Sequence, residues 1–295
     1  MTAEELRRRL DDRLRYKHAP RWRKPFLAPG RFARNQLRRF GLLRPPPGTV
    51  GRTRAFHLAD FTVVSGDPVS EEIIAFGVYE AELTGAFLRL LTPGQVAVDV
   101  GMHLGYFTTL FAELVGPGGQ VHAFEPTPST RTLAAANVHR FPQVTVHPFA
   151  VWSARQTLTF RDYGPRWLAY NSFTQARLET LGEGTPFPVE TITLDEFRES
   201  LRHPIALMKI DAESAEREIL RGAEKLLAAD RPLVSLEVGD PAPQATSREL
   251  IEWLTARQYR VWQWRPTGFQ PHAVQAQYAY DNLIFAPADR DLSRA

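Results

Sequence analysis

Short apolar runs separated by helix-length segments are the feature that most restricts the fold of this 295-residue chain. The clearest runs are five to eight residues long and apolar at successive positions, as expected of strands buried on both faces of a parallel sheet. Helical periodicity follows three of them, at Tyr106–Val115, Ser129–Arg140 and Ala215–Ala229. This alternation predicts an α/β fold. The five predicted strands are Val96–Val100, Gln120–Glu125, Val144–Val151, Ile205–Asp211 and Leu233–Val238.

The end of the chain follows a different pattern. Tyr259–Trp264 and Asn282–Pro287 read as strands, and no convincing helical pattern lies between them. Two such strands predict an antiparallel hairpin at the edge of the sheet, whereas dinucleotide dehydrogenases usually continue with a second parallel half. We therefore expect a mostly parallel, Rossmann-like sheet of seven strands that ends in an antiparallel hairpin.

Basic residues are concentrated at the start of the chain. Residues 1–50 hold 14 Lys and Arg against 4 acids, so the rest of the chain has a net charge near −7. Two interpretations of this basic extension are open. It contacts anionic lipid or a phosphorylated substrate, or it is a helical arm that is solvated or forms an oligomer. Nucleic-acid binding is not expected, because basic residues are not repeated across the main body.

Pro and Gly residues and changes in composition predict how the chain is divided into segments. Residues 1–50 form the basic N-terminal extension, which ends near Pro45–Gly48; residues 51–95 form a lead-in segment, and residues 96–288 form the main domain. Residues 161–190 are rich in aromatic residues, Gly and Pro, and they form either a lid over the site or an irregular surface excursion.

Composition excludes several kinds of chemistry. The chain has no cysteine, which rules out disulfides, thiolate nucleophiles and cysteine-ligated zinc. The His residues lack metal-binding spacing, so we predict no metal. No apolar stretch is long enough to span a bilayer and no signal-peptide pattern is present. We expect a cytoplasmic protein, with peripheral membrane contact through the basic arm left open.

Glycines at the end of the first predicted strand indicate a ligand site. Gly101 and Gly105 allow a tight strand-to-helix turn and close approach of the backbone to a ligand. The helix that follows can offer unpaired N–H groups to a carboxylate. In an open α/β sheet, ligands bind beyond the carboxyl ends of the strands, where these glycines lie.

Glu125 ends the next predicted strand, 20 residues after Gly105. A carboxylate at this place can accept both hydroxyls of a ribose. A solvated turn is the alternative for Glu125 alone, but together with the glycines a nucleoside site is the better interpretation. In the dinucleotide motif a middle glycine admits a diphosphate, and His103 occupies that place here. S-adenosylmethionine carries no phosphate, so it is the predicted cofactor.

Four blocks, in order, give the chain a family resemblance: Gly77–Thr84, Asp99–Thr108, Gly116–Pro128 and Met208–Ala223. Together they resemble the FkbM family of S-adenosylmethionine-dependent methyltransferases, over roughly residues 76–287. His103 replaces the family's commoner Asn, and Ser214 replaces its commoner Gly. The resemblance implies a class I methyltransferase fold and methyl transfer to oxygen (EC 2.1.1.-), on a hydroxyl of a sugar, glycolipid or secondary metabolite.

Candidate catalytic residues come from the fourth predicted strand and its exit. Lys209, Asp211 and Glu213 alternate and share one face that points to the carboxyl edge. We hypothesise that Asp211 or Glu213 is the base or orients the acceptor, held by Lys209. A structural Lys209–Asp211 ion pair is the open alternative. His103 is a further candidate, either as a base or as a hydrogen-bond donor in place of the usual Asn.

The cofactor set combines the residues above with others that the resemblance implies. The resemblance implies that Glu80 closes over the cofactor, whereas its neighbours in the sequence indicate a residue on a surface helix. Asp99 anchors the glycine turn or the cofactor's amino group. The predicted cofactor-binding residues are Glu80, Asp99, Gly101, His103, Gly105, Tyr106, Glu125, Pro126, Ala150 and Asp211.

Two other functions stay open at this point: an NAD(P)-dependent oxidoreductase on the same sheet, and a noncatalytic relative that binds cofactor or glycan. The predicted partner is a small-molecule or glycan acceptor, and homo-oligomerisation is left open.

Overall fold

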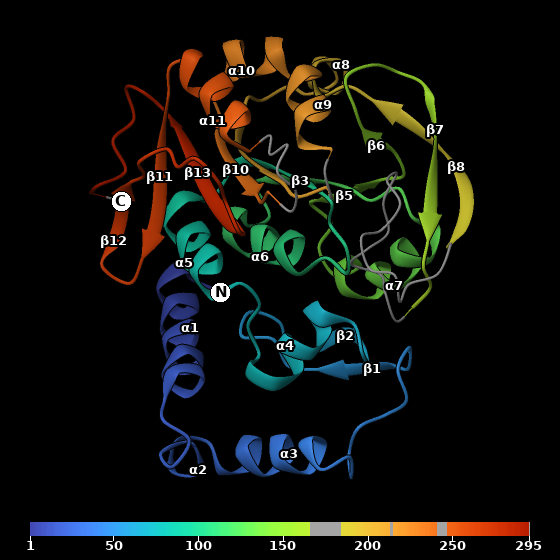
Figure 1. The fold of residues 1–295 in the computed structure, drawn as a ribbon, viewed down its shortest axis with the longest axis vertical. Helices are drawn as coiled ribbons and strands as arrows, with labels where there is room; N and C mark the ends of the chain where they lie inside the picture. The colour runs from blue at the N-terminus through green and yellow to red at the C-terminus, as the bar shows by residue number, and fades with distance from the viewer. Residues whose placement is uncertain (166–183, 213–214, 241–246, 295) are drawn as a thin grey trace.

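The computed structural model describes residues 1–165, 184–212, 215–240 and 247–294 (Figure 1). Within these residues the main sheet has eight strands in the order β12-β11-β13-β10-β9-β3-β4-β5. The five on the β5 side are parallel, and β13 runs antiparallel to both β10 and β11. The strands are β3 (Val96–Val100), β4 (Gln120–Phe124), β5 (Val144–His147), β9 (Ile205–Ile210), β10 (Leu233–Val238), β11 (Tyr259–Arg265), β12 (Gly268–Pro271) and β13 (Asp281–Pro287).

This sheet confirms the predicted fold class, a mostly parallel sheet with antiparallel strands at its C-terminal end. The count of seven strands omits β12, which forms a tight hairpin with β11 and extends the edge. The predicted strand Val144–Val151 is divided, because β5 stays in the main sheet while β6 (Ala150–Val151) pairs with another sheet. Pro148 lies between them and has no N–H to continue the ladder.

Helices cover both faces of the sheet (Figure 1). One apolar core joins the face that carries Ala97 and Val121 to α1, α4, α5 and α6, and a second core joins the opposite face to α8 through α11. The predicted helix Ala215–Ala229 is two helices, broken at Gly222, where a Cβ would lie 2.2 Å from the Trp152 carbonyl oxygen. The helices here are α4 (Pro68–Phe76), α5 (Ala81–Leu90), α6 (Tyr106–Val115), α7 (Pro128–Val138), α8 (Leu194–Glu199), α9 (Glu216–Arg221), α10 (Glu224–Asp230) and α11 (Ser247–Ala256).

A small sheet lies beside the carboxyl edge. It has the order β6-β8-β7, with β7 (Thr157–Asp162) and β8 (Thr185–Ile192) antiparallel. The two ends of the segment 161–190 are therefore strands, while residues 166–183, which make up most of the predicted lid, lie outside the described residues.

The N-terminal segment has two different parts. Helix α1 (Ala3–His18) buries Leu6 and Leu10 in the core against α5, so it belongs to the main body even though it is basic. Helices α2 (Lys24–Leu27) and α3 (Pro29–Arg39) lie further out, beyond α4 (Figure 1). Strands β1 (Val50–Thr53) and β2 (Phe61–Val64) pair antiparallel between them and the main sheet. Among the described residues, no helix is both long and apolar enough to cross a membrane.

Candidate functional site

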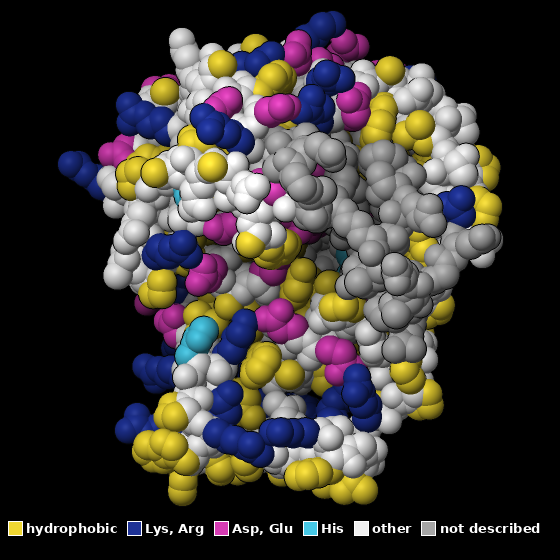
Figure 2. Space-filling view, in the orientation of Figure 1, with side chains coloured by type: hydrophobic (Ala, Val, Ile, Leu, Met, Phe, Trp, Pro, Cys, Tyr) yellow, Lys and Arg dark blue, Asp and Glu magenta, His cyan; other side chains and the backbone are white. Residues whose placement is uncertain are grey.

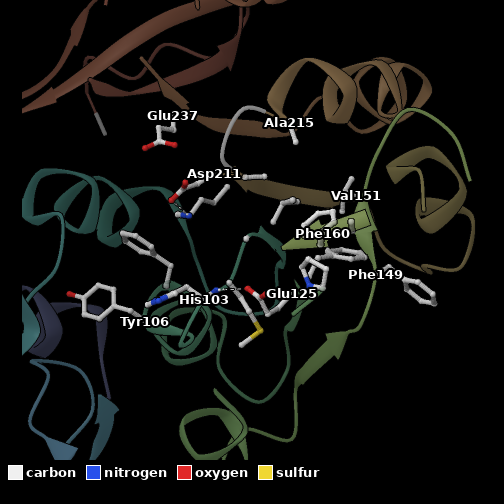
Figure 3. A pocket seen from close by; sticks show the side chains of 18 of the residues that line it. His103, Tyr106, Glu125, Phe149, Val151, Phe160, Asp211, Ala215 and Glu237 are labelled. Carbon is white, nitrogen blue, oxygen red and sulfur yellow. Dashed lines mark hydrogen bonds and ion pairs between the residues drawn. The ribbon is translucent and has the colours of Figure 1, made fainter. Parts of the chain in front are cut away.

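A pocket opens where the parallel strands β3, β4, β9 and β10 end (Figure 3). Tertiary structure brings these strand ends together because parallel strands expose their carboxyl ends at one edge. In Figure 3, Asp211 and Glu237 lie on one side of the pocket, Phe149, Val151 and Phe160 lie on the other, and His103 and Glu125 lie between them.

The glycine turn after β3 forms the floor of the pocket. Gly101 has φ +81°, and a Cβ there would lie 1.9 Å from the backbone oxygen of Asp211. Only glycine allows this close approach of two strand exits. Gly105, at φ +83°, directly precedes α6, and a Cβ there would crowd Met102 and Val138. Gly101 therefore lines the pocket, whereas Gly105 acts behind it by starting the helix.

Glu125 is buried at the end of β4 with its carboxylate fixed from two sides. One oxygen accepts the N–H of Thr127 at 2.9 Å and the other accepts the N–H of His103 at 3.1 Å. Burial raises the pKa of Glu125, although these donors and the His103 side chain oppose the rise. Each carboxylate oxygen has a second lone pair, which leaves acceptors available for ribose hydroxyls.

We expect the Glu125→Gln variant to bind S-adenosylhomocysteine about 10- to 100-fold more weakly, because a hydrogen bond to a charged group contributes roughly 1.5–3 kcal/mol. An amide can offer only one acceptor oxygen to the two backbone N–H groups and the ribose. Titration calorimetry measures the affinity, and Glu199→Gln on the exposed end of α8 is the matched control. Unchanged affinity in Glu125→Gln would rule out the ribose role.

His103 lies in the left-handed region at φ +50°, which Asn and His tolerate better than most side chains. Its Nε2 is 3.3 Å from the Oδ1 of Asp67, a buried residue that caps α4 by accepting the Ser70 N–H. Burial lowers the pKa of His103, but the Asp67 and Glu125 carboxylates outweigh burial and raise it. A raised pKa keeps the imidazole protonated to higher pH, and a protonated imidazole donates but cannot accept a proton, so this geometry favours the donor role over the role of base.

The His103–Asp67 pair should make stability depend on pH. The pKa of His103 is raised by folding, so its contribution is complete below its unfolded pKa of about 6.5 and is lost as pH rises through the folded value. Burial would raise the pKa of Asp67, but His103 and the Ser70 donors lower it, so its contribution is lost only at acid pH. We expect His103→Asn to lose more stability at about pH 6 than at about pH 9. Urea unfolding at both values measures this, with Asp67→Asn as the companion variant, and parallel profiles for wild type and variants would contradict it.

Lys209 is fully buried and surrounded by acids. Its Nζ donates to the Oδ2 of Asp211 at 2.9 Å, lies 3.9 Å from the Oδ1 of Asp99, and sits 5.2 Å from the ring centre of Phe107. Burial alone would lower the pKa of Lys209, but the neighbouring carboxylates raise it. Burial would likewise raise the pKa of Asp211, and Lys209 lowers it instead. Both groups are therefore charged at neutral pH.

Two further carboxylates face this ion pair. Glu80 directly precedes α5 at φ +40°, and its Oε1 accepts hydrogen bonds from the hydroxyl of Tyr280 and, at 3.0 Å, from the Nδ2 of Asn282. Glu80 is thus not a surface helix residue. Burial and Asp211 raise its pKa. At the end of β10, Glu237 lines the same pocket as Asp211, and its side chain lowers the pKa of Asp211 further.

The structure brings most of the predicted site residues to the pocket and places three behind it. Asp99 is buried in β3, where it accepts the Thr108 hydroxyl at 2.6 Å and ties β3 to α6; Glu80 and Gly105 also lie outside the lining. Glu213 lies outside the described residues. The predicted residues that line the pocket are Gly101, His103, Tyr106, Glu125, Pro126, Ala150, Lys209 and Asp211.

The other residues that line the pocket were not predicted from the sequence. Glu237 ends a predicted strand, so the argument that found Glu125 applies to it equally well. The apolar wall has no such signal, since it comes from the segment after β5 and from β7, which the small sheet positions. Its members are Phe149, Val151, Trp152 and Phe160.

The pocket fits S-adenosylmethionine better than a dinucleotide. Three carboxylates in its lining outnumber the two basic side chains, His103 and Lys209, and this excess of acids suits a sulfonium and an ammonium group and opposes a diphosphate. The apolar wall can pack against an adenine ring. Among the described residues, no three acidic or His side chains are arranged to hold a metal ion. Fold and pocket together define a nucleoside-binding protein of the Rossmann-like class.

The comparisons identify the family. A sequence model of the FkbM methyltransferase domain matches residues 99–261, so this chain belongs to the FkbM methyltransferase family, whose cofactor is S-adenosylmethionine. The predicted family and cofactor are confirmed.

Two curated relatives and one solved structure give the extent of the similarity. The 31-O-demethyl-FK506 methyltransferase FkbM of Streptomyces tacrolimicus is 31% identical over 177 residues, which are 51% of this chain and 66% of that protein. A protein-L-isoaspartate O-methyltransferase of Aeropyrum pernix is 42% identical over 60 residues, 20% of this chain and 23% of that one. The chain thus spans less than two thirds of either relative. The crystal structure of an FkbM methyltransferase from Methylobacillus flagellatus superposes with a TM-score of 0.42 at 12% sequence identity. The superposition covers 74% of this chain and 52% of that one.

Proposed function

We propose that this protein transfers a methyl group from S-adenosylmethionine to a hydroxyl oxygen of a sugar, glycolipid or secondary metabolite, with Asp211 as the base or acceptor-orienting group. When bound, S-adenosylmethionine supplies an electrophilic methyl group for in-line displacement. The curated relative whose printed name describes O-methylation supports an oxygen acceptor.

The observation that carries the proposal is an ionised carboxylate in the cofactor pocket, held by a buried cation. Lys209 keeps Asp211 charged although it is partly buried, and the 2.9 Å hydrogen bond fixes the direction of the carboxylate. A hydroxyl attacks the methyl group more readily as its proton leaves, and a positioned carboxylate can accept that proton. Asp211 lies on the opposite side of the pocket from the apolar wall that would hold the adenine (Figure 3).

The acidic pocket speaks against the oxidoreductase alternative, because a nicotinamide dinucleotide would bring its diphosphate next to several carboxylates. A noncatalytic relative is the remaining competitor. It would bind S-adenosylmethionine at the same pocket but release no S-adenosylhomocysteine.

The test uses the purified protein, methyl-labelled S-adenosylmethionine and a panel of sugar, glycolipid and polyol acceptors. We expect release of S-adenosylhomocysteine only with an acceptor, and label that survives alkali because a methyl ether is not hydrolysed by base. Alkali-labile label would indicate a carboxyl methyl ester and contradict the proposed acceptor. Cofactor binding without turnover on any acceptor would support the noncatalytic alternative.

A further inference from the structure

Helix α3 has its apolar face turned away from the protein. Large exposed apolar side chains follow at helical spacing from α2 through the end of α3, with Phe26 at 83%, Leu37 at 39% and Phe40 at 73% exposure. Pro29 and Ala33 lie on the same stripe and are also exposed. A surface helix of a globular protein normally buries such a stripe.

The polar face of α3 holds the helix to the body instead. Arg31 donates to the Phe76 carbonyl at 3.2 Å, Asn35 donates to the Ala75 carbonyl at 2.9 Å, and Arg38 pairs with Glu71 at 3.0 Å. These three residues repeat at positions i, i+4 and i+7, so they share one side of the helix. The orientation of α3 is thus fixed by polar contacts to α4, and its apolar side stays outward.

Neighbouring segments extend the apolar surface. Trp22 is 65% exposed and Leu42 is 71% exposed, and Leu27 and Leu43 are half exposed. We call the set formed by Trp22, Phe26, Leu27, Leu37, Phe40, Leu42 and Leu43 the outer face. Figure 2 shows hydrophobic side chains along this lower end of the molecule, with Lys and Arg directly beside them. An exposed apolar surface rimmed by charge marks an interaction site.

The charge of the same segment indicates the partner. Residues 19–50 contain eight Lys and Arg and no Asp or Glu. Arg21, Arg23, Arg34, Arg39 and Arg44 are exposed, and the Arg23 guanidinium stacks over the Trp22 ring at 4.7 Å. Pairing with a second copy would bring like charges together, whereas an anionic surface complements them. Basic residues around Trp, Phe and Leu on a helix are typical of a segment that lies in the bilayer interface.

We propose that the outer face docks this protein on an anionic membrane surface, with α3 lying in the plane of the interface. Helix α3 rests on α4, and Asp67 at the start of α4 pairs with His103 in the cofactor pocket. One helix therefore separates the bilayer from the pocket. This arrangement fits an acceptor presented at the membrane, although docking itself does not depend on methyl transfer.

The test is sedimentation of the whole 295-residue chain with vesicles of phosphatidylcholine alone and of phosphatidylcholine mixed with phosphatidylglycerol. We expect binding to the anionic vesicles, weakened by salt. The triple variant Phe26→Ser, Phe40→Ser and Leu42→Ser should partition at least about tenfold more weakly, because each removes exposed apolar surface that the bilayer would bury. Val274→Ser, an exposed apolar position elsewhere, is the control.

Two variants test the basic rim and the depth of docking. Arg39→Glu with Arg44→Glu should weaken binding to anionic vesicles by about tenfold or more, whereas Arg202→Glu between α8 and β9 should not. Trp22→Phe should keep binding but lose most of the blue shift of tryptophan fluorescence on vesicle addition. Retained S-adenosylhomocysteine binding shows that the variants are folded.

Equal sedimentation of wild type and the triple variant would overturn the proposal. Failure of the wild-type protein to bind either kind of vesicle would also overturn it. A wild-type dimer that is lost in the triple variant would do the same, since the outer face would then bind a second copy.

Discussion

The Asp211→Asn variant should transfer methyl groups about 10²-fold more slowly than wild type while still binding S-adenosylhomocysteine. General-base catalysis contributes about 10²–10⁴ in rate. The low end applies here, because Lys209 holds the pKa of Asp211 below its ordinary value and a less basic carboxylate is a weaker proton acceptor. Asn keeps the size of the side chain but removes both the negative charge and the acceptor for the proton.

Single-turnover assays at saturating cofactor and acceptor measure this effect without interference from binding. Asp289→Asn, at an exposed position after β13, is the matched control. Calorimetry with S-adenosylhomocysteine and a thermal melt separate slow chemistry from loss of fold. If Asp211→Asn turns over as fast as wild type, the catalytic role is contradicted. Asp211 would then have only a structural role, as the partner of a buried lysine.

Replacing Lys209 by Met should cost about 3–5 kcal/mol of stability, the range for removing one partner of a buried ion pair. Met fills a similar volume, so the loss reports the charge rather than a cavity. Without Lys209, the buried Asp99 and the partly buried Asp211 have no cation within hydrogen-bonding distance among the described residues. Their pKa values should then rise, so part of the loss should be recovered as pH falls toward about 4.

The measurement is urea unfolding at neutral and at acid pH. The double variant Lys209→Met with Asp211→Asn should be more stable than Lys209→Met alone, because the second change removes an unpaired charge. Lys225→Met on the exposed side of α10 is the control. A loss below about 1 kcal/mol, typical of a surface pair, would contradict the buried ion pair.

Local signals explain which elements could be predicted. Val96–Val100 and Tyr106–Val115 have the bounds that the sequence indicates, because apolar periodicity and the flanking glycines act within a few residues. Glu125 was found by the rule that strand ends face the ligand edge, and Glu237 obeys the same rule. Glu80 was found only by resemblance, since its partners Tyr280 and Asn282 lie about 200 residues along the chain.

The sequence by itself determined the α/β class, the glycine turn, the carboxylate of Glu125 at a strand end and the basic, acid-free segment, because each depends on residue types at short spacing. Tertiary structure alone decided that His103 meets Asp67, that Lys209 lies near Asp99 of the neighbouring strand as well as Asp211, and that the apolar side of α3 faces outward. The charge of each ionisable group depends on its burial and on the opposite charges beside it, and both depend on which distant segments pack together. The same helical pattern in α3 would fit a core helix, and only its polar contacts to α4 turn that stripe away from the protein.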